Sequence, residues 1–137
     1  MTVEERLFAL WRVAPDDEPD PDGRFGAVYT DPVTINGTPM AVGDLVERAR
    51  TLHRAFTGHE IEVVDRVTAP GKLVVAFRHT ARHTGPWTTP LGEIAPTGRT
   101  VTGLGIDVLT LAEDGRVTAI WVLADELQRI LQVHDVS

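Results

Sequence analysis

The sequence predicts an α+β fold in which a curved antiparallel sheet wraps on N-terminal helices as a cone-shaped α+β barrel. Apolar residues recur at helical spacing in the first part of the chain, and from about residue 60 their period changes to two, which is typical of strands. With 137 residues, 42% of them hydrophobic, residues 1–137 are expected to form one domain with its own core. The wide end of such a cone is a natural pocket.

The helices are expected to come first. Residues 3–12 carry apolar side chains at helical spacing. An acidic loop with three prolines follows at 15–23, and a short helix is expected near 24–29. The clearest helix covers 43–56, where one apolar stripe lies opposite a mostly charged face, and Gly58 is its expected stop.

The rest of the chain has the pattern of strands joined by turns. Strands are expected at 31–37, 60–68, 73–80, 100–111 and 116–123, and a helical turn at 125–131 closes the fold. Asn36-Gly37, Pro70-Gly71 and Asp114-Gly115 supply the turns. Residues 85–98 hold three prolines and three glycines, which indicates a long loop.

Composition excludes several classes of protein. The net charge of −7 argues against a broad nucleic-acid-binding face and against docking on an anionic membrane. Because cysteine is absent, there are no disulfides, thiolate nucleophiles or cysteine-ligated metal sites. The N-terminal segment lacks the pattern of a signal peptide, and no apolar run approaches a membrane span. We therefore expect a soluble cytoplasmic protein.

The common nucleophile and cofactor motifs are absent too. The only serine is Ser137, so a serine nucleophile is excluded. The Gly103-Leu104-Gly105 segment lacks the third glycine and the helix of a dinucleotide-binding loop, and no phosphate-loop lysine is present. No histidine spacing indicates a metal site. We therefore expect no cofactor and no metal, and chemistry carried by carboxylates and imidazoles.

Three aspartates are candidate acid/base residues. Asp125 follows a strand four residues after Trp121, so the two share a face, where an apolar surrounding raises a carboxyl pKa; the alternative is a helix N-cap. Asp31 can face a pocket as a general base or initiate a turn with Pro32. Asp107 stands in mid-strand between apolar neighbours, so it is either buried for a reason or exposed and paired with an arginine.

Two histidines are further candidates. His79 shares a strand face with Phe77 and is expected to point inward, where an imidazole can orient a carbonyl or shuttle a proton. The alternative is a core histidine whose hydrogen bonds are satisfied. His83 lies four residues further along, about 13 Å away on a strand, which is too far for a shared metal ion. His53 and His59 show no partner spacing.

Five short motifs follow one another in the second half of the chain. They are His83-Thr84-Gly85, Pro96-Thr97-Gly98-Arg99-Thr100-Val101, Gly105-Ile106-Asp107-Val108, Glu113-Asp114-Gly115-Arg116-Val117 and the span from Trp121 to Asp125. In this order they resemble the SnoaL-like polyketide cyclases of the nuclear-transport-factor-2-like superfamily. The segment Tyr29-Thr30-Asp31-Pro32-Val33 is similar to an element of the ketosteroid isomerase-like members.

The resemblance implies a cone that is usually dimeric through its sheet, with a hydrophobic pocket, no cofactor, and Asp125 as the general acid/base. For Asp31, a catalytic role is implied by the likeness to the ketosteroid isomerase-like members. His79 and His83 are expected at the pocket by position. The expected apolar wall consists of Phe25, Tyr29, Phe77, Trp87 and Trp121. The loop at 85–92 and the acidic segment at 16–22 depart from the family pattern, which leaves the substrate open.

We therefore expect a cofactor-independent cyclase or isomerase that tailors polyketides in secondary metabolism, such as antibiotic biosynthesis. Its expected partners are a hydrophobic small-molecule substrate and a second copy of the chain, without nucleic acid or membrane. One alternative is an epoxide hydrolase or epoxide-opening enzyme, which needs two carboxylates on one cavity, or a pericyclic cyclase of the same fold. Another is a non-catalytic ligand-binding or dimerisation module, because fold alone does not choose the function.

Overall fold

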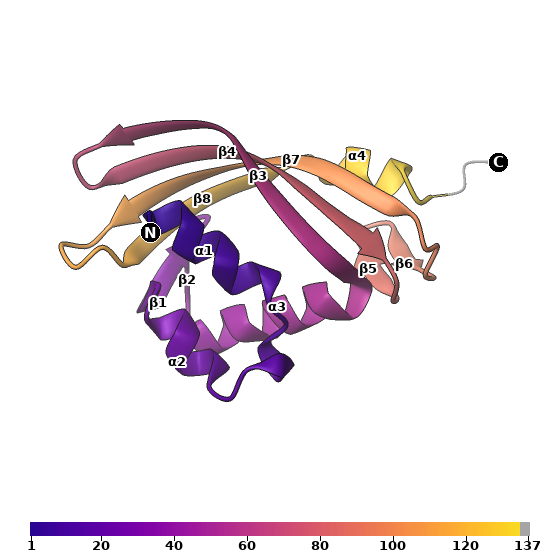
Figure 1. The fold of residues 1–137 in the computed structure, drawn as a ribbon, viewed down its shortest axis with the longest axis horizontal. Coiled ribbons are helices and arrows are strands. Elements are labelled where there is room, and N and C mark those ends of the chain that lie inside the picture. The colour runs from indigo at the N-terminus through magenta and orange to yellow at the C-terminus, as the bar shows by residue number, and fades with distance from the viewer. Residues whose placement is uncertain (135–137) are drawn as a thin grey trace.

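The computed structural model describes residues 1–134. Its helical elements are α1 (Val3–Arg12), the 3₁₀ turn η1 (Pro15–Asp17), α2 (Pro21–Gly26), α3 (Val42–Ala55) and α4 (Glu126–Leu131). Its strands are β1 (Tyr29–Ile35), β2 (Thr38–Met40), β3 (Phe56–Ala69), β4 (Lys72–His83), β5 (Trp87–Thr89), β6 (Gly92–Ile94), β7 (Thr100–Leu111) and β8 (Val117–Ala124). Figure 1 shows α1, α2 and α3 gathered on one side of a long, curved sheet. This is the predicted α+β cone.

Six strands form the main sheet, in the order β2-β1-β8-β7-β4-β3. Its neighbours pair antiparallel except β1 and β8, which run parallel. The sheet is open, with β2 and β3 at its edges, while β5 and β6 form a separate hairpin. Asn36 and Gly37, with φ of 49° and 85°, make the two-residue turn between β1 and β2 that the Asn-Gly pair predicts.

Local sequence sets the ends of the first helix and the faces of the longer ones. The Thr2 hydroxyl accepts a hydrogen bond from the Glu5 N–H, and the Glu5 carboxylate accepts one from the Thr2 N–H, so the two form a capping box. α1 and α3 each bury one apolar stripe towards the sheet; the buried apolar residues are Leu7, Phe8 and Leu10 of α1 and Val42, Leu45, Val46, Ala49 and Ala55 of α3.

The buried side chains form two clusters. The larger one joins α1, α2 and α3 to the concave face of the sheet. The smaller one lies where β3, β4, β7, β5 and α4 meet, and it consists of Ala55, Phe56, Ala81, Trp87, Val101, Ile130 and Val133. Because the long sheet extends beyond the helices, the second cluster closes the part that they leave uncovered.

The loop expected over residues 85–98 is in part a hairpin. Trp87 pairs with Ile94 across β5 and β6, and it is only 8% exposed. Its ring packs edge-on against Phe56, with centroids 5.0 Å apart. The prediction of a plain loop is therefore wrong, because burial of this one aromatic ring orders a segment whose prolines and glycines indicate only turns.

The short helix expected near 24–29 begins earlier, at Pro21, because the Asp20 carboxylate accepts the Gly23 N–H and caps it. None of the helices within residues 1–134 is both long and apolar enough to cross a membrane.

Candidate active site

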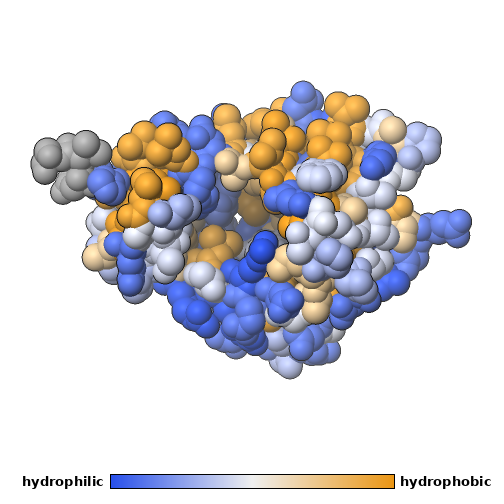
Figure 2. All heavy atoms as spheres, turned by 180° about the vertical axis from the view of Figure 1, so that it is seen from behind, coloured by the Kyte–Doolittle hydropathy of each residue, from blue (hydrophilic) through white to orange (hydrophobic). Residues whose placement is uncertain are grey.

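A partly open cavity of about 250 Å³ lies between the helices and the concave face of the sheet. Figure 2 shows the molecule hollowed between these two layers. The wall is mostly apolar: α1 supplies Leu7, Phe8 and Trp11, α3 supplies Leu45 and Leu52, and Phe77 comes from β4. This volume lies just below the range of small-molecule sites, which begins at about 300 Å³.

Asp107 is the carboxylate in this wall. It stands on β7 between Ile106 and Val108, with its side chain on the buried face, and it is 5% exposed. Its Oδ1 is buried and has no hydrogen-bond partner within residues 1–134. Burial raises the pKa of this carboxyl to about 7, since the charged form loses its hydration. Both protonation states are therefore populated near neutral pH, as a general acid and base requires.

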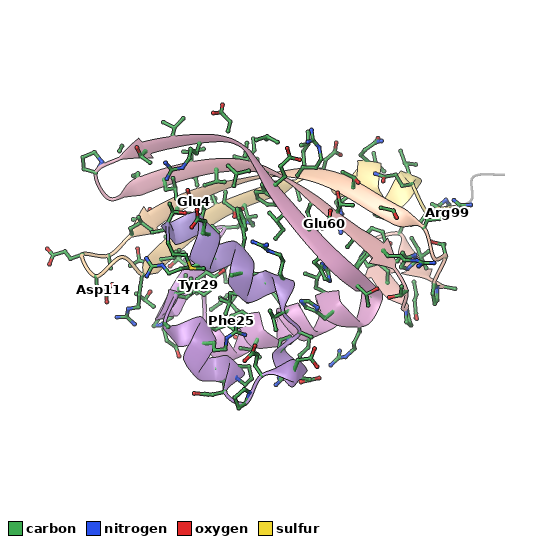
Figure 3. The ribbon with its side chains drawn as sticks, in the orientation of Figure 1. Glu4, Phe25, Tyr29, Glu60, Arg99 and Asp114 are labelled. Atoms are coloured by element: carbon green, nitrogen blue, oxygen red, sulfur yellow. The ribbon has the colours of Figure 1, made fainter. Side chains whose placement is uncertain are left out.

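Tyr29 and Trp11 add a second polar group to the wall. The Trp11 Nε1–H donates to the Tyr29 hydroxyl over 2.8 Å, which leaves the Tyr29 O–H proton free to donate elsewhere. Burial, aided by the nearby Asp107 charge, raises the pKa of Tyr29, so its hydroxyl stays protonated. Figure 3 shows Tyr29 and Phe25 in the space between the helices and the sheet.

His79 lines the cavity from β4 and belongs to a chain of hydrogen bonds. Its Nε2 lies 2.9 Å from Nδ1 of His59, and Nε2 of His59 lies 3.0 Å from the Phe56 carbonyl oxygen. Burial, with Arg129, His59 and His53 nearby, lowers the pKa of His79 to about 4. Burial also lowers the pKa of His59. Both rings are therefore neutral at neutral pH.

A bulge brings His59 to His79. The pairing of β3 with β4 shifts between Thr57 and Glu60, and Gly58 within that shift has a φ of 65°. Glycine adopts this left-handed conformation without steric cost, and bulges re-aim the side chains beside them. Gly58 therefore belongs to β3 and is not the expected stop of the preceding helix, which ends three residues earlier at Ala55.

The structure places the other two aspartates outside the cavity. Asp125 is exposed and caps α4, since its carboxylate accepts the Gln128 N–H over 3.3 Å. Asp31 is also exposed, and its Oδ1 accepts the Val42 N–H at the start of α3 over 3.2 Å. The placement of Asp125 and Asp31 at the pocket is thereby corrected: both carboxylates satisfy backbone donors at helix starts.

Three further expected pocket residues lie elsewhere. His83 is fully buried in the smaller cluster, where its Nδ1 lies 3.0 Å from the Thr97 hydroxyl, and Trp87 packs beside it. Trp121 is 59% exposed, because β8 turns it to the face of the sheet opposite the cavity neighbours Ile120 and Val122.

Phe25 is the last of the corrected wall residues. It is 1% exposed and packs against Trp11 and Tyr29, with ring centroids 5.5 Å and 6.3 Å away, so it lies behind the cavity wall. Of the expected site residues, the structure brings Tyr29, Phe77, His79 and Asp107 to the cavity.

Sequence reasoning missed Trp11, Arg48 and His59. Trp11 belongs to the apolar face of α1, but helical spacing alone does not distinguish a cavity wall from a solid core. Arg48 lines the cavity from α3 and is exposed. The bulge that re-aims His59 leaves one local signal, a glycine next to the histidine.

A family model described as SnoaL-like polyketide cyclase matches residues 24–133. No curated protein sequence matches the chain. Among solved structures, TsrD from Streptomyces laurentii superposes with a TM-score of 0.74 at 16% identity, over 96% of this chain and 94% of that one.

Two further structures share the fold. A SnoaL-like polyketide cyclase from Agrobacterium tumefaciens has a TM-score of 0.72 at 12% identity, over 98% of this chain and 99% of that one. An NTF2-like protein from Exiguobacterium has a TM-score of 0.65 at 17% identity, over 91% and 99%. Since the family model covers most of its length, this chain belongs to the SnoaL-like polyketide cyclase family.

Proposed function

We propose that the protein is a cofactor-independent cyclase or isomerase that moves protons on a small, apolar carbonyl compound of polyketide type, with Asp107 as its general acid and base. The observation that carries the proposal is the Asp107 carboxyl, buried in an apolar cavity wall with Oδ1 unpartnered within residues 1–134. A buried polar atom without a partner is uncommon in proteins and is explained when a ligand supplies the partner.

The chemistry follows from the groups in the wall. In the proposed step the Asp107 carboxylate removes a proton from the carbon next to a substrate carbonyl. The electron pair of the C–H bond moves onto the carbonyl oxygen, which the Tyr29 O–H stabilises as a hydrogen-bond donor. The enolate carbon then attacks a second carbonyl of the substrate and closes a ring, and the Asp107 carboxylic acid returns its proton to the new alkoxide. Protonation at another carbon instead gives an isomerase.

A single carboxylate argues against the epoxide-opening alternative. That chemistry uses a pair of carboxylates on one cavity, and Asp107 is the only acidic residue in the wall described above. Asp31 and Asp125 point elsewhere and bond backbone N–H groups. The family and the cavity favour cyclisation or isomerisation within polyketide-type secondary metabolism.

The test uses 2-tetralone, a small aromatic ketone with exchangeable hydrogens next to its carbonyl. Exchange of these hydrogens in D₂O is followed by proton NMR with and without the protein. Wild type is expected to accelerate exchange, and Asp107→Asn to lose about 100-fold or more of that rate. Asp125→Asn and Asp31→Asn serve as matched controls and keep the wild-type rate. Exchange that is equally fast with Asp107→Asn contradicts the proposal, and binding without any exchange favours a shape-based cyclase or a binding module.

We further propose that two copies associate through the face of the sheet that points away from the cavity. Leu104 and Ile106 of β7 and Trp121 and Leu123 of β8 are exposed there, between 46% and 76%. Ile106 lies directly opposite Leu123 in the strand register. A contiguous apolar patch of this kind is typical of a contact with another protein.

A further inference from the structure

The chain of hydrogen bonds from Phe56 to His79 determines which ring nitrogens carry protons. A carbonyl oxygen only accepts, so Nε2 of His59, 3.0 Å from the Phe56 oxygen, must carry a hydrogen. In a neutral ring the other nitrogen is then an acceptor. Nδ1 of His59 therefore accepts, and Nε2 of His79, 2.9 Å away, must donate.

The geometry of the two rings supports this assignment. Their planes differ by only 6°, with centroids 5.2 Å apart. An N–H and a ring lone pair both lie in the plane of their imidazole, so near-parallel rings let the donor and the acceptor face each other. The bulge at Gly58 holds His59 in this position.

The remaining nitrogen of His79 is Nδ1, which by this chain has a lone pair and no hydrogen. It has no hydrogen-bond partner within residues 1–134, and it is not among the side-chain atoms sealed from solvent. His79 lines the cavity, and Nδ1 is the nitrogen of its ring that no other group within residues 1–134 engages.

We propose that His59 is a positioning residue, which fixes His79 as a hydrogen-bond and proton acceptor towards the cavity. The ligand group that fits is a donor, such as a phenol or enol hydroxyl, at the end of the cavity away from Asp107. His79 pairs with Gly103, whereas Asp107 pairs with Val75, so the two groups are four residues, or about 13 Å, apart along the strands. The inference rests on the proposed function only for the assumption that the ligand is a substrate.

The charged and titratable groups around His79 disfavour a positive charge on its ring, after burial itself. His59 comes from β3, His53 from α3 and Arg129 from α4, and all three oppose a positive charge on His79. Arg129 is itself held over the rings of Phe56 and Trp87, 5.4 Å and 5.3 Å from their centroids, and paired with Glu126. At neutral pH a neutral His79 ring can accept a hydrogen bond from a substrate hydroxyl at Nδ1, whereas a protonated ring could not.

The first test reads the tautomer directly. Long-range ¹H–¹⁵N correlation spectra of the protein with ¹⁵N-labelled histidine report the protonation of each ring nitrogen. At pH 7.5 His79 is expected to show a protonated Nε2 and an unprotonated Nδ1. A protonated Nδ1, or a charged ring, overturns the proposal.

Variants then ask whether His59 sets that state. His59→Leu removes the acceptor, so His79 is expected to exchange between both tautomers. His59→Asn places its Oδ1 where Nδ1 was and is expected to restore the single tautomer. The matched control is His53→Gln, because His53 belongs to the same cluster but bonds the Trp11 carbonyl, 2.8 Å from its Nε2. A His79 spectrum that His59→Leu leaves unchanged contradicts the positioning role.

The second test reads ligand preference, with 2-naphthol and 2-methoxynaphthalene as probes that differ in one donor hydrogen. Fluorescence titration is expected to show about fivefold tighter binding of 2-naphthol, the effect of one hydrogen bond. His79→Leu abolishes that preference and His53→Gln keeps it. Equal affinities in wild type, or a preference that survives His79→Leu, overturn the inference.

These results separate the two proposals. If Asp107→Asn leaves ketone exchange intact while the tautomer and the naphthol preference hold, the acid/base function fails and the role of His59 stands. If exchange depends on Asp107 but His79 has the other tautomer, the acid/base function stands and the positioning role of His59 fails.

Discussion

Asp107 illustrates how one residue's surroundings decide its chemistry. Of the three candidate aspartates, Asp31 and Asp125 bond backbone N–H groups and remain exposed. Asp107 faces an apolar cavity with Oδ1 unpartnered within residues 1–134, and its pKa rises to about 7. The same side chain thus accepts a backbone N–H at a helix start in two places and is the proposed proton carrier in the third.

The raised pKa predicts how stability depends on pH. In the unfolded chain the Asp107 carboxyl ionises near 3.8, and in the folded protein near 7. Between these pH values the folded state holds a proton that the unfolded state has released, so the free energy of unfolding falls as pH rises. Asp107→Asn removes this dependence. From pH 4 to pH 8 the variant is expected to gain on the order of 4 kcal/mol relative to wild type.

Urea denaturation of both proteins across this range measures the difference. The lowered pKa of His79 makes both proteins less stable below about pH 6.5, and this contribution cancels because both contain His79. A difference between variant and wild type that is constant with pH contradicts the assignment.

At the scale of elements, two glycines of β7 leave space that side chains of neighbouring elements fill. A methyl group on Gly105 would lie 2.5 Å from Cζ of Phe77, and one on Gly103 would lie 2.5 Å from Cδ of Arg129. The Phe77 ring therefore occupies the space above Gly105. The position of Phe77, which lines the cavity from β4, thus depends on the lack of a side chain at Gly105 on β7.

Gly105→Ala is expected to push the Phe77 ring from its place and towards the cavity. The crowding is expected to destabilise the fold by about 1–3 kcal/mol and to weaken binding of 2-tetralone. Gly43→Ala is the matched control: it lies in α3 with open space around it, and the added methyl is expected to stabilise the helix by about 0.5–1 kcal/mol. Urea denaturation and ligand titration measure both, and equal effects at the two glycines argue against this packing.

Much of this arrangement is predictable from sequence, because periodicity reports which face of an element is buried. The helical stripe of α3, the long strands and the inward face that carries Phe77 and His79 follow from local pattern. The hairpin at Trp87 and the contact of His59 with His79 do not, since each depends on residues brought together by register and by a bulge. Asp31 and Asp125 show the same limit. The sequence pattern predicts the strands beside them, but the hydrogen-bond partner of each carboxylate is a backbone N–H of a helix that the strand pattern does not place.

At the scale of the whole molecule, the two faces of the sheet differ in what covers them. Helices cover the concave face over the cavity, whereas the opposite face of β7 and β8 exposes Leu104, Ile106, Trp121 and Leu123. Apolar side chains gather on the sheet side of the view in Figure 2. A second copy of the chain would remove this surface from water.

The proposed dimer predicts twice the mass of one 15.0 kDa chain in sedimentation experiments. Replacing both Ile106 and Leu123 by lysine is expected to give a monomer, because four charges would then meet at the interface of two copies. Leu91→Lys is the control, since Leu91 is 67% exposed on the β5–β6 turn, away from this face. A wild-type monomer, or a double variant that stays dimeric, contradicts the arrangement.

Part of the cavity's apolar wall lies outside the region that the family model matches. Asp107, His79 and Tyr29 lie on strands within the region that the family shares, residues 24–133. Leu7, Phe8 and Trp11 come from α1, which precedes that region. We therefore expect α1 to influence which molecule the cavity accepts without supplying the proposed acid/base group. Exchange of about the first twenty residues between relatives is expected to change which ligand binds, while the proposed reaction stays the same.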